Sequence, residues 1–150
     1  MFFPHENVTM HIPDGWIRQA AALPVRKGRV CLINSRNRKR WVIPKGWIDP
    51  GQTAGESALQ EAWEEAGLVG ALDQEPIGSY VYEKDGQKYH VIVFVMRVTG
   101  VEQDWPERDF RERSWVSPEG FFERIEDEGL IELARLTVMQ HTAEHVAAEA

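Results

Sequence analysis

The segment from Gly46 to Leu68, GWIDPGQTAGESALQEAWEEAGL, constrains this chain more than any other. Thr53, followed three residues later by Glu56, has the pattern of a capping box, which marks the first turn of a helix. Gly67 stands where a left-handed residue usually ends such a helix. The segment therefore predicts an irregular loop that leads into one short helix with defined ends.

Three glutamates of the predicted helix share one face, because Glu61, Glu64 and Glu65 are spaced three and four positions apart. Like charges at these spacings destabilise a helix by repulsion. Clustered carboxylates are also the oxygen ligands that Mg2+ uses when it bridges a protein to phosphate groups. A solvated acidic face is the simpler interpretation, and a metal site is the functional one.

The loop in front of the helix favours the functional interpretation. Its prolines and glycines impose an irregular backbone just before the helix N-terminus: Pro44, Gly46, Pro50 and Gly51. A helix N-terminus attracts anions, including phosphate. The loop and helix together thus offer a phosphate-binding end and a metal-binding face.

This segment resembles the Nudix box, the signature of Nudix hydrolases. The box reads Gly, five residues, Glu, seven residues, Arg-Glu, an aliphatic residue, any residue, Glu-Glu, any residue, Gly and an aliphatic residue. The matching positions here are Gly46, Glu61, Ala62, Glu64, Glu65, Gly67 and Leu68. Two positions depart from the box, because Gln52 replaces its first Glu and Gln60 replaces its Arg.

The resemblance implies a hydrolase of phosphoanhydride bonds that depends on Mg2+ or Mn2+. It implies that Glu61 and Glu65 are metal ligands, that Glu64 is a ligand or the catalytic base, and that the Gly46 carbonyl completes the site. Family members often use one further glutamate from outside the box. Glu112, three residues before Trp115, is our candidate for that catalytic role.

Two other interpretations of the acidic residues near Glu112 stay open. Glu107 is the second choice for the additional catalytic glutamate. Glu112 itself could be a surface acid paired with Arg111 or Arg113, since acids beside arginines usually form such pairs.

The two departures from the box predict slower turnover rather than loss of activity. Gln60 keeps hydrogen-bonding capacity but lacks the charge and the fork geometry of Arg. Gln52 has the shape of Glu but is a poor metal ligand. Restoring Gln60→Arg or Gln52→Glu should leave the fold intact and should raise activity, or at least not lower it. A collapse of activity would mean that the glutamines belong to a rewired site.

Basic residues gather in the loop before the box, in a chain of formal net charge −7. A solvated loop is the usual fate of such a run, but here it adjoins the predicted phosphate loop. We expect substrate phosphates to contact Arg18, Arg36, Arg38, Lys39, Arg40 and Lys45. Further candidates are Lys84, Lys88 and His90.

A second resemblance concerns the substrate. The Trp-x-x-Pro-x-Gly sequence before the box and an Asp-Trp segment followed by arginines are similar to the diphosphoinositol polyphosphate phosphohydrolase-like branch of the family. The residues that carry it are Trp41, Pro44, Gly46, Asp104, Trp105, Arg111, Arg113 and Trp115. This resemblance implies diphosphoinositol polyphosphates or dinucleoside polyphosphates as substrates, although Trp and Arg equally often serve packing.

Two alternative functions remain at this point. One is hydrolysis of another nucleoside diphosphate derivative, such as a nucleotide sugar or a capped RNA 5′ end. The other is a non-catalytic ligand-binding Nudix domain, with Gln52 and Gln60 as traces of lost activity. Retention of Glu61, Glu64 and Glu65 argues against the second alternative.

Hydrophobic and charged shares of 43% and 27% are ordinary for a globular protein, so we expect one domain over residues 1–150. The net charge argues against a stable nucleic-acid partner and against binding to a membrane surface. Cys31 lies in an apolar run and is expected in the core. The N-terminus lacks the features of a signal peptide, and the run Val91–Met96 is too short to span a bilayer. We expect a cytoplasmic protein, monomeric or homodimeric.

Apolar patterning predicts a mixed sheet between helices, an α/β or α+β fold, which the resemblance sharpens to the Nudix α/β/α sandwich. The expected strands are 17–25, 29–35, 41–43, 77–83, 88–99 and 111–116. A loop is expected through Gly70, and an arm or edge strand over residues 1–15. Ser117-Pro118 should open a helix. The terminal helix, 130–147, should bury Leu130, Leu133, Leu136 and Met139.

Overall fold

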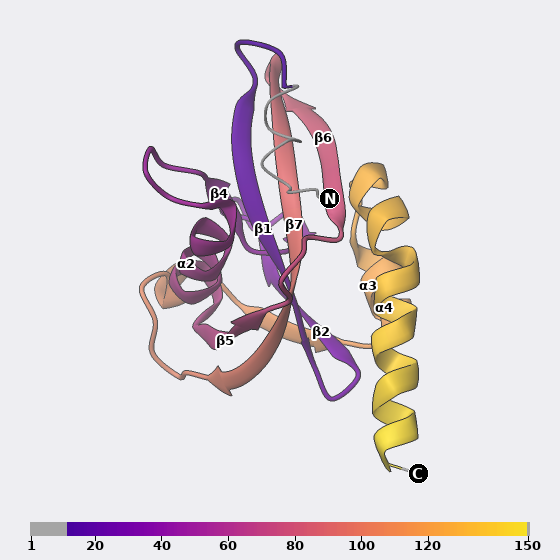
Figure 1. The fold of residues 1–150 in the computed structure, drawn as a ribbon. Helices are drawn as coiled ribbons and strands as arrows, with labels where there is room; N and C mark the ends of the chain where they lie inside the picture. The colour runs from indigo at the N-terminus through magenta and orange to yellow at the C-terminus, as the bar shows by residue number, and fades with distance from the viewer. Residues whose placement is uncertain (1–11, 150) are drawn as a thin grey trace.

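The computed structural model describes the backbone of residues 12–149 and the side chains of residues 12–140. Within these residues, eight strands form one mixed sheet with helices on both faces (Figure 1). The strands are β1 (Ile17–Arg26), β2 (Arg29–Asn34), β3 (Trp41–Val42), β4 (Lys45–Trp47), β5 (Leu68–Leu72), β6 (Gly78–Lys84), β7 (Gln87–Val101) and β8 (Arg113–Val116). The helices are α2 (Ala54–Ala66), α3 (Pro118–Arg124) and α4 (Glu128–Glu149), with a 3-10 turn at Arg108–Phe110. The predicted α/β/α sandwich is confirmed.

The sheet is organised around β1 and β7, which pair in parallel, while its other pairings are antiparallel. The main path runs β3-β2-β1-β7-β5, with β4 paired to β1, β6 to β7 and β8 to β2. Residues Val91–Met96 of β7 are all buried. An unbroken apolar strand needs cover on both faces, so β7 has the central place that its sequence predicts.

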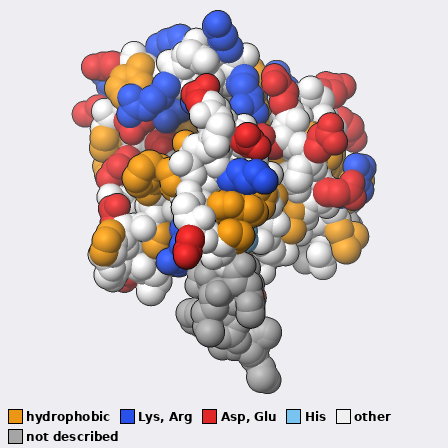
Figure 2. Space-filling model, turned by 90° about the horizontal axis from the view of Figure 1, so that it is seen from above, with side chains coloured by type: hydrophobic (Ala, Val, Ile, Leu, Met, Phe, Trp, Pro, Cys, Tyr) orange, Lys and Arg blue, Asp and Glu red, His pale blue; other side chains and the backbone are white. Residues whose placement is uncertain are grey.

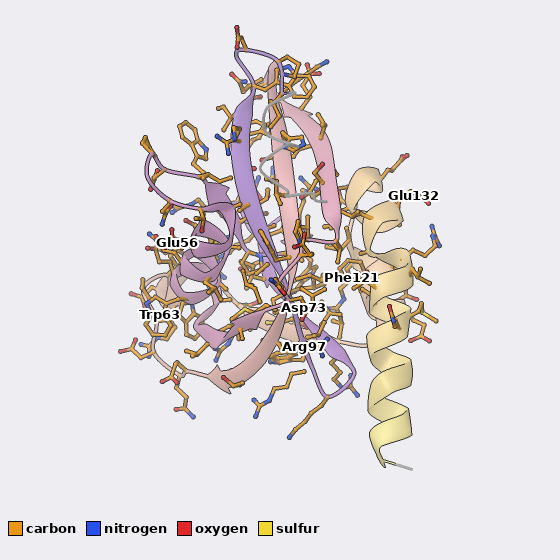
Figure 3. The ribbon with its side chains drawn as sticks, in the orientation of Figure 1. Glu56, Trp63, Asp73, Arg97, Phe121 and Glu132 are labelled. Carbon is orange, nitrogen blue, oxygen red and sulfur yellow. The ribbon has the colours of Figure 1, made fainter. Side chains whose placement is uncertain are left out.

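Alternate residues of β7 enter two separate cores, because successive side chains of a strand point to opposite faces. On one face, Ile92 and Phe94 pack with the buried alanines of α2: Ala58, Ala62 and Ala66. On the other, Val91 and Val93 pack with Phe121 of α3 and with α4. Figure 3 shows Glu56 and Trp63 on α2 and Phe121 on the opposite side of the sheet. Cys31 is buried in the α2-side core, as expected.

The predicted buried face of α4 is wrong in its second half. Leu130 is buried, but Leu136 is 79% exposed and Met139 is 52% exposed. The helix instead buries Leu130, Ala134 and Val138, which are four residues apart. At 3.6 residues per turn, a stripe that advances by three drifts about half a turn between residues 130 and 139, whereas steps of four stay near one line.

The segment after α2 is also not the predicted loop, because β5 begins directly at Leu68 and pairs with β7. Gly70 lies where the pairing register shifts, and a Cβ there would lie 2.2 Å from the Arg97 carbonyl oxygen. Pairing with a long central strand outweighs the low strand propensity of a Gly-Ala pair. Residues 12–15 form no strand, and the rest of the predicted N-terminal arm lies outside the described residues.

None of the described helices has the length and apolarity needed to cross a membrane.

Candidate active site

Helix α2 begins with the predicted capping box. The Thr53 hydroxyl accepts a hydrogen bond from the Glu56 amide at 3.0 Å, and the Glu56 carboxylate accepts one from the Thr53 amide at 2.9 Å. These bonds satisfy two backbone donors that a helix N-terminus otherwise leaves unpaired. Gly67 ends the helix in the left-handed conformation, with φ of 66°.

The C-terminal end of α2 is held by the segment that follows β7. Trp105 Nε1 donates to the Glu65 carbonyl at 3.0 Å, and Arg113 donates to the Ala66 carbonyl at 3.0 Å. The Arg113 guanidinium lies over the Trp105 ring at 4.1 Å, and that ring covers Gly67 so closely that a Cβ there would lie 2.8 Å away. Trp105 and Arg113 therefore act by fixing α2, which supports the packing interpretation for this part of the chain.

Two of the predicted metal ligands, Glu61 and Glu65, form a close pair. Glu65 is 8% exposed, Glu61 is half-buried, and their carboxyl groups share a hydrogen bond. Burial, followed by this hydrogen bond, raises the pKa of Glu65 to about 9, although Arg111 opposes the shift. Burial raises the pKa of Glu61 as well. The raised pKa values favour a state in which the two carboxyl groups share one proton, which a bound cation would displace.

The backbone of Gly46 lies directly against this pair. A Cβ on Gly46 would lie 2.3 Å from the carboxyl carbon of Glu61 and 2.6 Å from Oε2. Gly46 pairs with Ala20 across β4 and β1, so the sheet fixes this close approach. The amide of Lys45 donates to Glu65 Oε1 at 3.3 Å. Only glycine leaves room here for the carboxylate.

The third predicted ligand, Glu64, is engaged by a neighbouring glutamine of α2. Its Oε2 accepts a hydrogen bond from Gln60 Nε2 at 2.8 Å. Across the described residues, no three acidic, histidine or cysteine side chains converge on one possible metal position. The residues fit a divalent cation held by the Glu61–Glu65 pair and the Gly46 backbone, with water and substrate oxygens completing the shell, as is usual for Mg2+.

Arg111 links the carboxylate pair to Glu107. Arg111 is 8% exposed, and it donates to Glu107 Oε1 at 2.9 Å and to the Asn34 carbonyl at 2.7 Å. Its second terminal nitrogen lies 3.8 Å from Glu65 Oε1. A single buried guanidinium thereby compensates carboxylates from two different elements.

The structure does not bring Glu112 to the carboxylate pair. Arg111 has extended backbone angles, so the side chains of Arg111 and Glu112 point in opposite directions. Glu112 is exposed, and its amide donates to the Asn34 side chain. Glu107, the second choice from the sequence, is connected to the pair through Arg111. Its spacing of four from Arg111, across the 3-10 turn, was the available signal.

A cavity of about 190 Å³ opens beside the pair. Its wall combines one glutamate with five basic side chains, and its lining residues are Ser35, Arg36, Arg40, Val42, Ile43, Lys45, Glu65, Tyr82, Lys84 and Arg111. Three of the six predicted substrate contacts, Arg36, Arg40 and Lys45, are among them. Sequence reasoning named Lys84 only as a further candidate and overlooked Tyr82 and the role of Arg111.

The other predicted phosphate contacts lie outside this cavity. Arg38 adopts a left-handed turn conformation, with φ of 61°, and donates to the Asp109 carbonyl at 3.4 Å. Lys39 is exposed beside it. Arg18 lies on β1 opposite His90, on the α2 face of the sheet. Lys88 lies over the Trp16 ring at 5.4 Å. Figure 2 shows how lysines and arginines alternate with acids over the upper surface.

Contacts with neighbouring residues hold the basic side chains of the cavity wall in place. Arg40 pairs with Asp127 at 3.1 Å, and Arg36 lies 3.7 Å from Glu107. The Lys45 ammonium lies 5.3 Å from the centre of the Tyr82 ring. Burial lowers the pKa of Lys45, while Asp127 and Glu65 oppose this shift. These contacts hold the charged groups at the cavity before any ligand arrives.

The shared proton predicts a pH-dependent stability for the metal-free protein. Glu65 has a pKa of about 9 when folded, against an ordinary value of 4.5, so unfolding releases a proton between these values. The free energy of unfolding should therefore fall as pH rises from about 5 to about 9. His90 has a pKa lowered by burial, so it makes the free energy of unfolding rise with pH just below its ordinary value of 6.5.

Thermal unfolding in a chelator checks this prediction. Glu65→Gln removes the titration, so its melting temperature should fall less across this range than that of the wild type. The variant should also be the more stable of the two at the alkaline end. Parallel curves for the two proteins would contradict the shared proton.

Comparison with known families identifies the class of protein to which this fold and this glutamate-bearing helix belong. The model of the NUDIX domain matches residues 16–135. The chain therefore belongs to the Nudix family of hydrolases and is a Nudix pyrophosphohydrolase.

Particular relatives are moderately similar. The chain is 34% identical over 113 residues to bovine (Bos taurus) diphosphoinositol polyphosphate phosphohydrolase 3-beta, covering 71% of this chain and 68% of that protein. It is 31% identical over 124 residues to mouse (Mus musculus) diphosphoinositol polyphosphate phosphohydrolase 2, and the match covers 79% of this chain and 67% of that protein. It is 35% identical over 101 residues to Nudix hydrolase 12, mitochondrial, of Arabidopsis thaliana, covering 62% of this chain and half of that relative.

Solved structures share the fold. The MutT protein from Methanosarcina mazei Go1 aligns with a TM-score of 0.67 and 24% identity, covering 87% of this chain and 98% of that one. A C. elegans Ap4A hydrolase aligns with a TM-score of 0.66 and 18% identity, and the alignment covers 79% of this chain and 93% of that one. At these identities the likeness concerns the architecture alone.

Proposed function

We propose that this pyrophosphohydrolase acts on polyphosphorylated small molecules, either diphosphoinositol polyphosphates or dinucleoside polyphosphates. One observation carries the proposal: the Glu61–Glu65 pair adjoins a cavity whose wall presents five basic side chains. Glu65 belongs to both the pair and the cavity wall. Phosphates bound by the basic side chains would therefore lie beside the carboxylates.

In this proposal Mg2+ or Mn2+ is held by Glu61, Glu65 and the Gly46 carbonyl, with Glu64 as an additional ligand or as the base. The metal, when bound, supplies neutralisation of phosphate charge and acidification of a water molecule. Glu61 and Glu65 must give up their shared proton to hold it, so binding should release a proton. Arg111 limits the repulsion that the two ionised carboxylates then feel. Glu107 takes the place of Glu112 as the additional glutamate.

The cavity favours phosphate groups over a stacked base. Tyr82 is the aromatic residue of its lining, and its ring is already engaged by two side chains. Tyr89 stacks on it at 4.6 Å with an angle of 6° between the planes, and the Lys45 ammonium also lies over the ring. Arg40 Nε is buried and makes no hydrogen bond to any described residue, although Glu126 lies 3.5 Å away. Arg40 as a whole lines the cavity, and its positive charge favours a phosphate group there.

The relatives named diphosphoinositol polyphosphate phosphohydrolases support the same substrate class. Hydrolysis of a nucleotide sugar or capped RNA remains the second candidate, since the carboxylate pair alone would serve it equally. Three expectations from the sequence stay predictions: a single domain over residues 1–150, a monomeric or homodimeric state, and a cytoplasmic location.

Phosphate release from a panel of substrates, with magnesium present, tests the proposal. The double change Arg36→Gln with Lys84→Gln should lower kcat/KM on diadenosine hexaphosphate by about tenfold per cation, because each loses a charge-assisted contact. The loss on ADP-ribose should be smaller. Raising ionic strength should reduce the wild-type preference for the hexaphosphate, since both side chains are accessible to salt.

Arg38→Gln with Lys39→Gln is the matched control, because it removes the same charge from the neighbouring turn outside the cavity. It should change neither efficiency by more than about twofold. Equal losses from the two double changes would favour the second candidate. A wild type that is inactive on every substrate would indicate a non-catalytic domain.

A further inference from the structure

Gln52 and Gln60, the two residues that depart from the Nudix box, contact each other. Gln52 Nε2 donates to Gln60 Oε1 at 2.5 Å, and Gln60 Nε2 donates to Glu64 Oε2 at 2.8 Å. The amide of Asp49 donates to Gln52 Oε1 at 3.4 Å. These bonds form a chain from the loop before α2 to a glutamate of its acidic face. We call Gln52 and Gln60 the amide pair.

The carboxylate sets the direction of every bond in this chain. The carboxylate of Glu64 accepts hydrogen bonds, so Gln60 must present its NH2 group to it. The carbonyl oxygen of Gln60 then faces Gln52, which must donate in turn. This leaves the Gln52 oxygen free to accept from Asp49. Hydrogen bonds aligned in one direction strengthen each other, and the last one gains from the charge of its acceptor.

Neither member can be exchanged alone without a conflict. A glutamate at position 52 has no donor, so the Gln60 amide would have to turn and present its oxygen to Glu64. An arginine at position 60 has no acceptor, so Gln52 would have to turn and would lose its bond with the Asp49 amide. Introduced together, a glutamate and an arginine satisfy each other, and the arginine still donates to Glu64.

We propose that the amide pair is a coupled positioning unit that orients Glu64 for the hydrolytic reaction, and that its two residues are compatible only as a pair. The inference rests on the proposed function, in which Glu64 acts as a ligand or base. It reverses the expectation, drawn from the sequence, that either restoration alone is harmless. Gln52→Glu should be harmful, because it breaks the bond to Glu64.

A double-mutant cycle tests the coupling through kcat and KM on diadenosine hexaphosphate. Gln52→Glu should lower kcat about tenfold, the worth of one hydrogen bond to a charged group, with KM within about twofold. Gln60→Arg should have a smaller effect, because its contact with Glu64 survives. The double variant should exceed Gln52→Glu in kcat and approach the wild type. Gln74→Glu, the same substitution at an exposed loop position, is the control and should match the wild type.

A second measurement reports the hydrogen bonds without catalysis. In nitrogen-15 NMR spectra of the metal-free protein, the side-chain amide signals of Gln52 and Gln60 should both move in Glu64→Gln. The Gln60 signal should also move in Gln52→Glu and stay in place in Gln74→Glu. Melting temperatures establish that all variants fold.

The outcomes separate this inference from the proposed function. Additive effects in the cycle, or a Gln52→Glu variant with wild-type kcat, would overturn the coupling while leaving the hydrolase intact. Unchanged Gln60 signals in Gln52→Glu would overturn it as well. A wild type without activity on any substrate would overturn the proposed function, whatever the amide signals show.

Discussion

Replacing Glu65 by Gln is expected to lower kcat by at least about 100-fold, the usual cost of removing a charged group that stabilises a transition state. Glu61→Gln should have a comparable effect, because the two carboxyl groups share one site. Gln keeps the size and hydrogen bonds of each side chain, so neither change should unfold the protein. The measurement is phosphate release at saturating magnesium, with melting temperature recorded alongside.

Glu56→Gln is the matched control for these two variants. It lies on the same helix and can still accept the Thr53 amide bond that closes the capping box. Its kcat should stay within about twofold of the wild type, because an exposed acid outside the pair contributes little. Normal turnover of Glu65→Gln would disprove the assignment of the pair.

The same assay also distinguishes the two candidates for the additional catalytic glutamate, Glu107 and Glu112. Glu107→Gln should reduce kcat more than Glu112→Gln, since Glu107 shares Arg111 with Glu65 while Glu112 points away. The reverse order would restore the interpretation based on sequence alone.

Gly46→Ala is expected to remove most activity, by about 100-fold, while costing little stability. The added methyl group would lie 2.3 Å from the Glu61 carboxyl carbon, and the sheet pairing of Gly46 with Ala20 holds the backbone in place. The Glu61 carboxylate is the mobile end of a long side chain, so it should yield before the fold does. A displacement of about 1 Å at a catalytic group can cost two orders of magnitude in rate.

Gly55→Ala provides the control for this substitution. A Cβ at Gly55 would lie 3.4 Å from Leu72, which is ordinary contact, and alanine is favoured over glycine inside a helix. This variant should keep its kcat and gain slightly in melting temperature. If Gly46→Ala kept normal turnover, or if it lost activity only through unfolding, the close approach would not be a catalytic requirement.

Both large effects depend on a helix that is fixed at each end. Its start is set by Thr53 and Glu56, and its end is held by Trp105 and Arg113, which donate to its last carbonyls. Small alanines on its inner face bring it close to the sheet. The carboxylates of Glu61 and Glu65 thereby meet the backbone of β4 at a distance that only Gly46 permits.

Short-range order in this protein could be derived from the sequence. The ends of α2, the common face of its glutamates and the doubly buried strand β7 all follow from spacings within a few residues. Such features depend on backbone periodicity and on hydrogen bonds between near neighbours, which local sequence determines. The same reasoning found the carboxylate pair, because a helix places residues four apart side by side.

Tertiary structure decided what surrounds the pair. The basic run before the box predicted six phosphate contacts, yet only Arg36, Arg40 and Lys45 reach the cavity, because the chain turns away at Arg38. Lys84 and Arg111 reach it from β6 and from the segment before β8, far along the chain.

Long-range packing likewise decided two further features. A buried arginine holds Glu107 near the pair, and pairing with β7 makes β5 a strand instead of a loop. The coupling of Gln52 with Gln60 belongs to the same group. Eight positions apart, on a loop and a helix, these side chains meet only because the loop folds back over the first turns of α2, and no local periodicity encodes that approach.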